Sequence, residues 1–184
     1  MKKALLIHGA YGNPKENWFP WLTKELEKKG YKVTIPSFPT PINQSFKNWE
    51  LELLPYLKKI DENSIVIAHS IGVVFILKIL EKNDLCPRNI YFISGFLSKL
   101  GIERFDNINK TFYQKINFTK INRYSPQVYI YHSDNDPYVN QKHAIELARN
   151  IPGSRLTIIK KAGHFNIDSG FKEFPELLND ILNS

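Results

Sequence analysis

Hydrophobic and polar positions along the chain follow two alternating patterns. Short, nearly continuous apolar runs are typical of strands buried on both faces, and longer segments with apolar residues at helical spacing are typical of amphipathic helices. The short runs predict six strands, at residues 3–7, 32–35, 64–68, 89–94, 127–132 and 154–159. The longer segments predict helices at residues 18–29, 46–59, 71–82, 141–149 and 173–182.

Regular alternation of strands with helices or long crossovers predicts an α/β fold. Such connections favour a mostly parallel six-stranded sheet that is flanked by helices, and right-handed crossovers make it doubly wound. We expect the strand order 2-1-3-4-5-6 and, for a chain of 184 residues, a single domain that spans residues 1–184. The carboxyl ends of the strands, where α/β proteins place their reactive groups, then meet at one edge.

Ser70 lies at the sharpest predicted turn, between the strand at 64–68 and the helix at 71–82. The sequence Ala68-His69-Ser70-Ile71-Gly72 has the small-x-Ser-x-Gly pattern of a nucleophile elbow, in which larger side chains at positions 68 and 72 would collide. The pattern occurs by chance in about one chain of this length in ten. Its place between a strand and a helix is therefore the stronger argument that Ser70 is a nucleophile.

A serine nucleophile needs a base, and His164 is the best candidate. It follows the last predicted strand, in the loop Lys161-Ala162-Gly163-His164-Phe165, which is where this fold places a general base. The other four histidines favour structural roles. We expect His69 to point away from the Ser70 hydroxyl, His132 to pack at a strand end, His143 to lie on a helix and His8 to be a satisfied structural residue.

The acid that orients the base should follow the strand at 127–132, where two aspartates compete. Asp136 precedes Pro137, which stiffens the turn and so orders the carboxylate in advance. Asp134 has the place of a turn residue that bonds its own backbone. We favour Asp136, with Asp134 as the alternative.

Two backbone N–H groups should form an oxyanion hole. One is the amide of Ile71, directly after the nucleophile, and the other should come from the loop His8-Gly9-Ala10-Tyr11 after the first strand. We favour the amide of Ala10, with that of Tyr11 as the alternative.

Charge and cysteine content narrow the function classes. The 25 Lys and Arg against 18 Asp and Glu give a net charge of +7, but the lysines are scattered singly and in pairs, so we expect no nucleic-acid partner. The single cysteine, Cys86, allows no intramolecular disulfide. The first apolar stretch is too short for a signal peptide or a membrane span. We therefore expect a cytoplasmic protein without a membrane span.

Taken together, these motifs resemble the small serine hydrolases of the alpha/beta-hydrolase superfamily, and within it the YdeN-like, retinoblastoma-binding-protein-type family. The matching pieces span nearly the whole chain: His8-Gly9-Ala10, 17–21, 68–72, Ser94-Gly95-Phe96, 133–139 and Gly163-His164-Phe165. The resemblance implies a minimal alpha/beta-hydrolase fold without a full lid domain, a Ser70-Asp136-His164 triad, no metal and no organic cofactor. Ala68 replaces the superfamily's commoner glycine.

The function that the sequence favours is cleavage of small carboxylic esters or thioesters through an acyl-enzyme. Its partner would be a small-molecule acyl substrate, and nothing in the sequence indicates a protein partner. The alternatives are a peptidase or amidase, or a non-catalytic protein-binding module on a hydrolase scaffold, because a fold alone does not imply a function.

Two further features leave alternatives open. Trp18, Trp21 and Trp49 could line an acyl pocket, but their helical spacing among leucines favours the core.

Residues 97–126, at 30 residues, are long for a bare connection and carry +4 of the net charge. They form either a crossover whose aromatic residues fill the core, or a partial cap that favours anionic substrates through Lys110 and Lys115. The aromatic residues are Phe105, Phe112, Tyr113, Phe118 and Tyr124.

Overall fold

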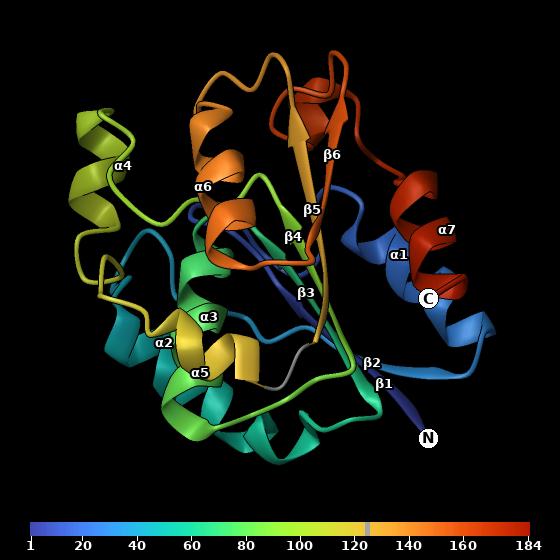
Figure 1. The fold of residues 1–184 in the computed structure, drawn as a ribbon. Helices are drawn as coiled ribbons and strands as arrows, with labels where there is room; N and C mark the ends of the chain where they lie inside the picture. The colour runs from blue at the N-terminus through green and yellow to red at the C-terminus, as the bar shows by residue number, and fades with distance from the viewer. Residues whose placement is uncertain (124–125) are drawn as a thin grey trace.

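A six-stranded parallel sheet forms the centre of the computed structural model, which describes residues 1–123 and 126–184 (Figure 1). Its strands are β1 (Lys2–Ile7), β2 (Tyr31–Thr34), β3 (Ser64–His69), β4 (Asn89–Ile93), β5 (Gln127–Ser133) and β6 (Arg155–Ile159). Every neighbouring pair is parallel, and the order is β2-β1-β3-β4-β5-β6. Both the predicted strand order and the α/β fold class are confirmed.

Helices cover both faces of the sheet (Figure 1). The α-helices of the described residues are α1 (Phe19–Lys28), α2 (Phe46–Leu53), α3 (Ile71–Asn83), α4 (Glu103–Ile108), α5 (Phe118–Arg123), α6 (Lys142–Asn150) and α7 (Pro175–Leu182). Helices α1 and α7 pack on one face, against Leu6 and Ile67, and helices α2, α3 and α6 pack on the other, against Ile7 and Val66. None of the described helices has the length and apolar character that a bilayer span requires.

One predicted helix divides into two elements. The segment at 46–59 is α-helical only to Leu53 and continues as a 3₁₀ helix from Leu54 to Lys59. Pro55 is the cause, because its ring nitrogen has no hydrogen to donate and its ring crowds the preceding turn. Trp49 lies on the α-helical part and is fully buried.

The tryptophans belong to the core, as their spacing favoured. Trp18 and Trp49 have no exposed surface, and Trp21 is half-buried against the core beneath α1. None of the three lines the cavity described below.

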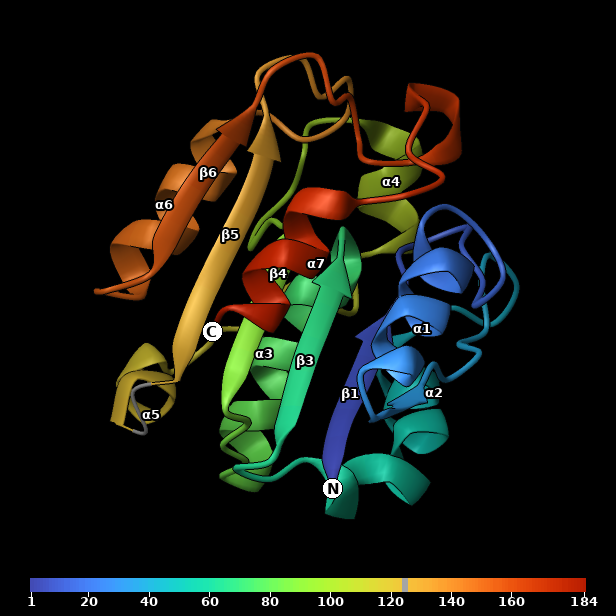
Figure 2. The same ribbon diagram turned by 90° about the vertical axis from the view of Figure 1, so that its right-hand side faces the viewer.

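The segment after β4 has two parts with different surroundings. Phe112 is buried against Trp49 and Phe75, as the crossover interpretation requires. Helix α4, in contrast, lies at the sheet edge to which the strands point (Figure 2). Tyr124, one of the predicted core aromatics, lies outside the described residues.

Candidate active site

The nucleophile elbow is formed at Ser70, between β3 and α3. Its backbone has φ 58° and ψ −126°, a conformation that residues other than glycine rarely adopt. The Ser70 N–H donates to the Ile93 carbonyl at 2.9 Å, which ties the turn to the end of β4. The strained turn places the hydroxyl at the start of α3, in the cavity described below.

Close packing explains why small residues surround Ser70. A Cβ at Gly72 would lie 2.8 Å from Ile7 Cγ2 and 2.9 Å from the His8 carbonyl oxygen. The nearest obstacles are thus atoms at the end of β1. A Cβ at Gly9 would lie 2.9 Å from the Ser70 Cβ, so only glycine allows this loop to approach the hydroxyl so closely.

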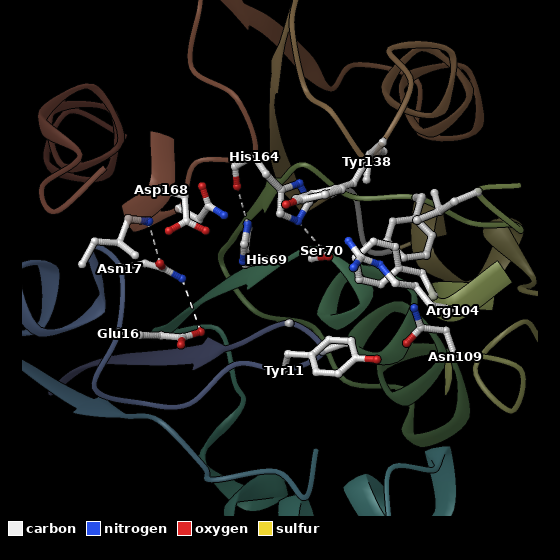
Figure 3. A pocket seen from close by; sticks show the side chains of 18 residues that line it. Tyr11, Glu16, Asn17, His69, Ser70, Arg104, Asn109, Tyr138, His164 and Asp168 are labelled. Carbon is white, nitrogen blue, oxygen red and sulfur yellow. Dashed lines mark hydrogen bonds between the residues drawn. The ribbon is translucent and has the colours of Figure 1, made fainter. Parts of the chain in front are cut away.

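A chain of hydrogen bonds connects the three residues predicted to act together. His164 Nε2 lies 3.1 Å from Ser70 Oγ, and His164 Nδ1 lies 2.8 Å from Asp136 Oδ2 (Figure 3). The side chain of Asp136 is completely buried and that of His164 is nearly so. The structure therefore brings together a hydroxyl, an imidazole and a carboxylate that are far apart in the sequence.

Four donors hold the carboxylate of Asp136. In addition to His164, Ser94 Oγ donates to Oδ2 at 2.8 Å, and the N–H groups of Tyr138 and Val139 donate to Oδ1 at 2.9 and 3.0 Å. Burial alone would raise the pKa of Asp136, but the hydrogen bond and the charge of His164, together with these N–H groups, lower it to about 2.

Two details of this arrangement differ from the sequence interpretation. Ser94 has no predicted role beyond its place in the motif Ser94-Gly95-Phe96, and only its position at the end of β4 could have indicated the contact with Asp136. Asp134 is exposed, and its carboxylate accepts the N–H of Lys161 at 2.7 Å, so it does not bond its own turn.

The loop that carries His164 is held from both sides. Four consecutive backbone N–H groups, at residues 161–164, donate to side-chain oxygens of Asp134, Ser133, Asn135 and Ser169. In two further contacts the backbone of this loop accepts: the ring N–H groups of His69 and Trp18 donate to the carbonyls of His164 and Phe165 at 2.8 and 2.9 Å.

His69 thus points away from the Ser70 hydroxyl, as expected, and toward the backbone of His164 (Figure 3). Burial lowers the pKa of His69 to about 3, so its ring stays neutral with a hydrogen on Nε2. This positioning contact was not foreseen, since a buried histidine beside an elbow has no pattern that reveals its acceptor.

The two candidate oxyanion donors in the loop after β1 differ in whether their N–H groups are already bonded. The N–H of Tyr11 donates to Thr40 Oγ1 at 2.7 Å and is therefore occupied. Among the residues that the structure describes, the N–H groups of Ala10 and Ile71 have no acceptor. This arrangement favours Ala10 over the alternative, Tyr11.

Three of the remaining histidines are buried, as expected for structural residues. His8 Nε2 accepts the N–H of Phe38 at 3.0 Å, so its Nδ1 carries the hydrogen and donates to the Gly9 carbonyl at 2.8 Å. His132 donates through Nε2 to the Val139 carbonyl at 2.9 Å, and His143 is buried on α6.

A cavity of about 420 Å³ opens above Ser70, which is a suitable size for a small ligand. In Figure 3 the side chains of Glu16, Asn17 and Asp168 lie to one side of Ser70, and those of Arg104 and Asn109 lie to the other. Burial raises the pKa of Glu16 above its ordinary value. Lys110 and Lys115 are exposed and do not line this cavity.

Strained backbone gathers around the cavity. Eight described residues other than glycine have positive φ angles. Six of them lie in the cavity lining or in the loops directly beside it: Tyr11, Asn17, Ser70, Ser94, Lys161 and Phe165.

A parallel sheet in the order 2-1-3-4-5-6, with a serine at the elbow after its third strand, defines the class of the alpha/beta hydrolases. The family model for serine hydrolases matches residues 4–183, so this chain belongs to the serine hydrolase family and is a serine hydrolase.

Named relatives agree with this assignment. YdeN of Bacillus subtilis (strain 168), which is named as a hydrolase, is 29% identical over 100% of this chain and 95% of its own length. The serine hydrolase RBBP9 of Rattus norvegicus is 25% identical over 98% of this chain and 95% of its own. The crystal structure of the B. subtilis ydeN gene product has a TM-score of 0.89 at 27% identity, and the match covers 100% of this chain and 98% of that one. The expected YdeN-like family is confirmed.

Proposed function

We propose that this serine hydrolase cleaves small carboxylic esters or thioesters through an acyl-enzyme on Ser70. The single observation that carries the proposal is the hydrogen-bond chain from Ser70 Oγ through His164 to Asp136, with distances of 3.1 and 2.8 Å. A hydroxyl is a poor nucleophile unless a positioned base removes its proton during attack. His164 Nε2 has the position of that base.

In the proposed first half-reaction, Ser70 Oγ attacks the ester carbonyl carbon while His164 Nε2 takes the hydroxyl proton. The carbonyl oxygen becomes an oxyanion that accepts the N–H groups of Ala10 and Ile71. Asp136 stays ionised and stabilises the imidazolium. When the C–O or C–S bond breaks, His164 returns the proton to the departing alcohol or thiol, and Ser70 keeps the acyl group.

In the second half-reaction, a water molecule replaces the alcohol. His164 takes a proton from the water as its oxygen attacks the acyl carbon, and the bond to Ser70 Oγ then breaks. The proton returns to Ser70, and a carboxylic acid leaves. The cycle needs no group besides the substrate and water.

The test is labelling with a fluorophosphonate, which reacts with activated serines. We expect wild type and Ser98→Ala, a change at an exposed serine outside the cavity lining, to be labelled equally. Ser70→Ala should not be labelled, and it should lower ester turnover about a thousandfold or more while the circular dichroism spectrum stays the same.

Three outcomes would overturn the proposal. Labelling of Ser70→Ala at wild-type level would remove Ser70 as the nucleophile. Faster cleavage of a peptide amide than of its matched ester would move the function to a peptidase or amidase. Absence of both labelling and turnover in the wild type would favour a binding module.

A further inference from the structure

Arg104 contributes a cation to the cavity. Its side chain extends from α4 toward the space above Ser70, and its guanidinium carbon lies 4.6 Å from the centre of the Phe105 ring (Figure 3). Stacking of this kind occupies the face of the guanidinium and leaves the N–H groups at its edge free to donate. An edge of parallel N–H donors matches the two oxygens of a carboxylate.

Aromatic contacts place this cation relative to the reacting residues. The ring of Phe105, which supports Arg104, packs edge to face against Tyr11 and Tyr138, with centroid distances of 6.1 and 5.3 Å. Tyr138 in turn packs against the ring of His164 at 5.2 Å. A row of ring contacts therefore connects Phe105, over which the Arg104 guanidinium lies, with the proposed base.

No carboxylate among the described residues pairs with this cation. On the same helix, the carboxylate of Asp106 accepts the N–H groups of Leu100 and Gly101 at 2.8 and 2.9 Å and the Tyr113 hydroxyl at 3.0 Å. Within the described ranges, 1–123 and 126–184, Arg104 forms no ion pair. Its donors are available to a ligand.

We propose that Arg104 is a specificity-determining residue that binds a carboxylate carried by the ester substrate. The inference rests on the proposed esterase function. The cavity also gives the substrate a direction, because Glu16 and Asp168 lie across Ser70 from Arg104 and would repel a second carboxylate at that end (Figure 3). The substrate that fits is thus a monoanionic ester whose charge lies on the α4 side of the scissile bond.

Two pairs of esters test this proposal, one for each side of the scissile bond. For the acyl side, the p-nitrophenyl hemiester of glutarate is compared with p-nitrophenyl valerate, which has a methyl group in place of the carboxylate. For the alcohol side, 4-acetoxybenzoate is compared with its methyl ester. The measured quantity is the ratio of kcat/KM for the anionic ester to kcat/KM for the neutral one, in the wild type and in each variant.

We expect Arg104→Gln to lower this ratio about tenfold or more in one of the two pairs, because a charge-assisted hydrogen-bonded pair is lost. Arg104→Lys, which keeps the charge without the planar fork, should give an intermediate ratio. Lys110→Gln is the matched control, since it removes one positive charge from the same segment at an exposed position outside the cavity. Its ratio should stay within about twofold of the wild type.

Ratios that stay within twofold for Arg104→Gln in both pairs would overturn the proposal. An equal effect of Lys110→Gln would also do so, because the preference would then come from the general field of the segment. Either result, with ester turnover intact, would leave the proposed hydrolase function standing. A wild type that hydrolyses none of the four esters and resists fluorophosphonate would reject that function, and this inference with it.

Discussion

The groups that face the cavity from its two sides are positioned by different kinds of interaction. On the side of His164, six hydrogen bonds fix the backbone of residues 161–165. On the side of α4, Asp106 accepts hydrogen bonds that hold the helix, but Phe105 is positioned by ring contacts, and the Arg104 side chain forms no hydrogen bond with the described residues. Hydrogen bonds are directional, whereas ring packing tolerates shifts and substitutions.

In the proposed reaction, this difference separates the chemical step from substrate recognition. Proton transfer requires the three groups to stay within hydrogen-bond distance, so the side that carries His164 is fixed by many polar contacts. The α4 side needs only to present suitable groups to the remainder of the substrate. We therefore expect substitutions on the first side to change the rate of the chemical step, and those on the second side to change which ester is preferred.

The largest expected effect on the fixed side is that of Asp136→Asn. An amide cannot stabilise the imidazolium and can hold the wrong tautomer of His164, so kcat should fall about a thousandfold. Asp134→Asn should cost less than about threefold, because an amide oxygen can still accept the N–H of Lys161. Steady-state kinetics on one neutral ester decides between them, and the reverse ranking would make Asp134 the acid.

A smaller effect should be visible in the pH dependence of stability. The pKa of Asp136 is lowered from 3.8 to about 2 in the folded protein, so its ionised form stabilises the fold above pH 4. This contribution, of about 2 kcal/mol, should be lost as the pH falls from about 4 to about 2.

Urea unfolding of the wild type and of Asp136→Asn at a series of pH values measures this contribution. The free energy of unfolding of the wild type should exceed that of the variant by a margin that shrinks as the pH falls. A margin that stays the same from pH 6 to pH 2.5 would contradict the lowered pKa.

The smallest effect of this series should come from His69, which acts only through the backbone of His164. His69→Phe leaves the His164 carbonyl without its donor, and kcat should fall about tenfold with little change in KM. His69→Gln places an amide N–H near the same position and should recover most of the rate. Because the pKa of His69 is about 3, the loss should be equal at pH 6 and pH 9. An effect that appears mainly in KM would move His69 to the recognition side.

Much of the fold was predictable because it follows from local pattern. The six strands and their order follow from apolar runs separated by helical segments, and Ser70, Asp136 and His164 each follow a strand in a fold whose strand ends meet at one edge. The end of the α-helix at Leu53 could also have been predicted from Pro55. The apolar periodicity of the segment continues past this proline and favoured one long helix instead.

The contacts that could not be predicted join residues distant in sequence through single hydrogen bonds or ring contacts. Ser94 reaches Asp136 across 42 positions, and His69 reaches His164 across 95. Arg104 is one of six cations in the segment at 97–126, and nothing in the sequence marks it as the one that faces the cavity. Charge and periodicity indicate whether a side chain lies toward the core or toward solvent. They do not indicate which distant residue it contacts.

The positive φ angles around the cavity have a consequence for how this protein can change. Each such residue costs about 1–3 kcal/mol, and six of the eight lie at the edge that carries Ser70. The opposite edge is therefore where substitutions can make the molecule more heat-resistant without disturbing its chemistry. At the cavity edge, the residues with positive φ lie in the loops that carry Ser70 and His164, so substitutions there act on the geometry of these side chains as well as on stability. Substitutions that raise thermal stability and substitutions that change activity are thus expected at opposite ends of the same sheet, and selection can act on the two properties separately.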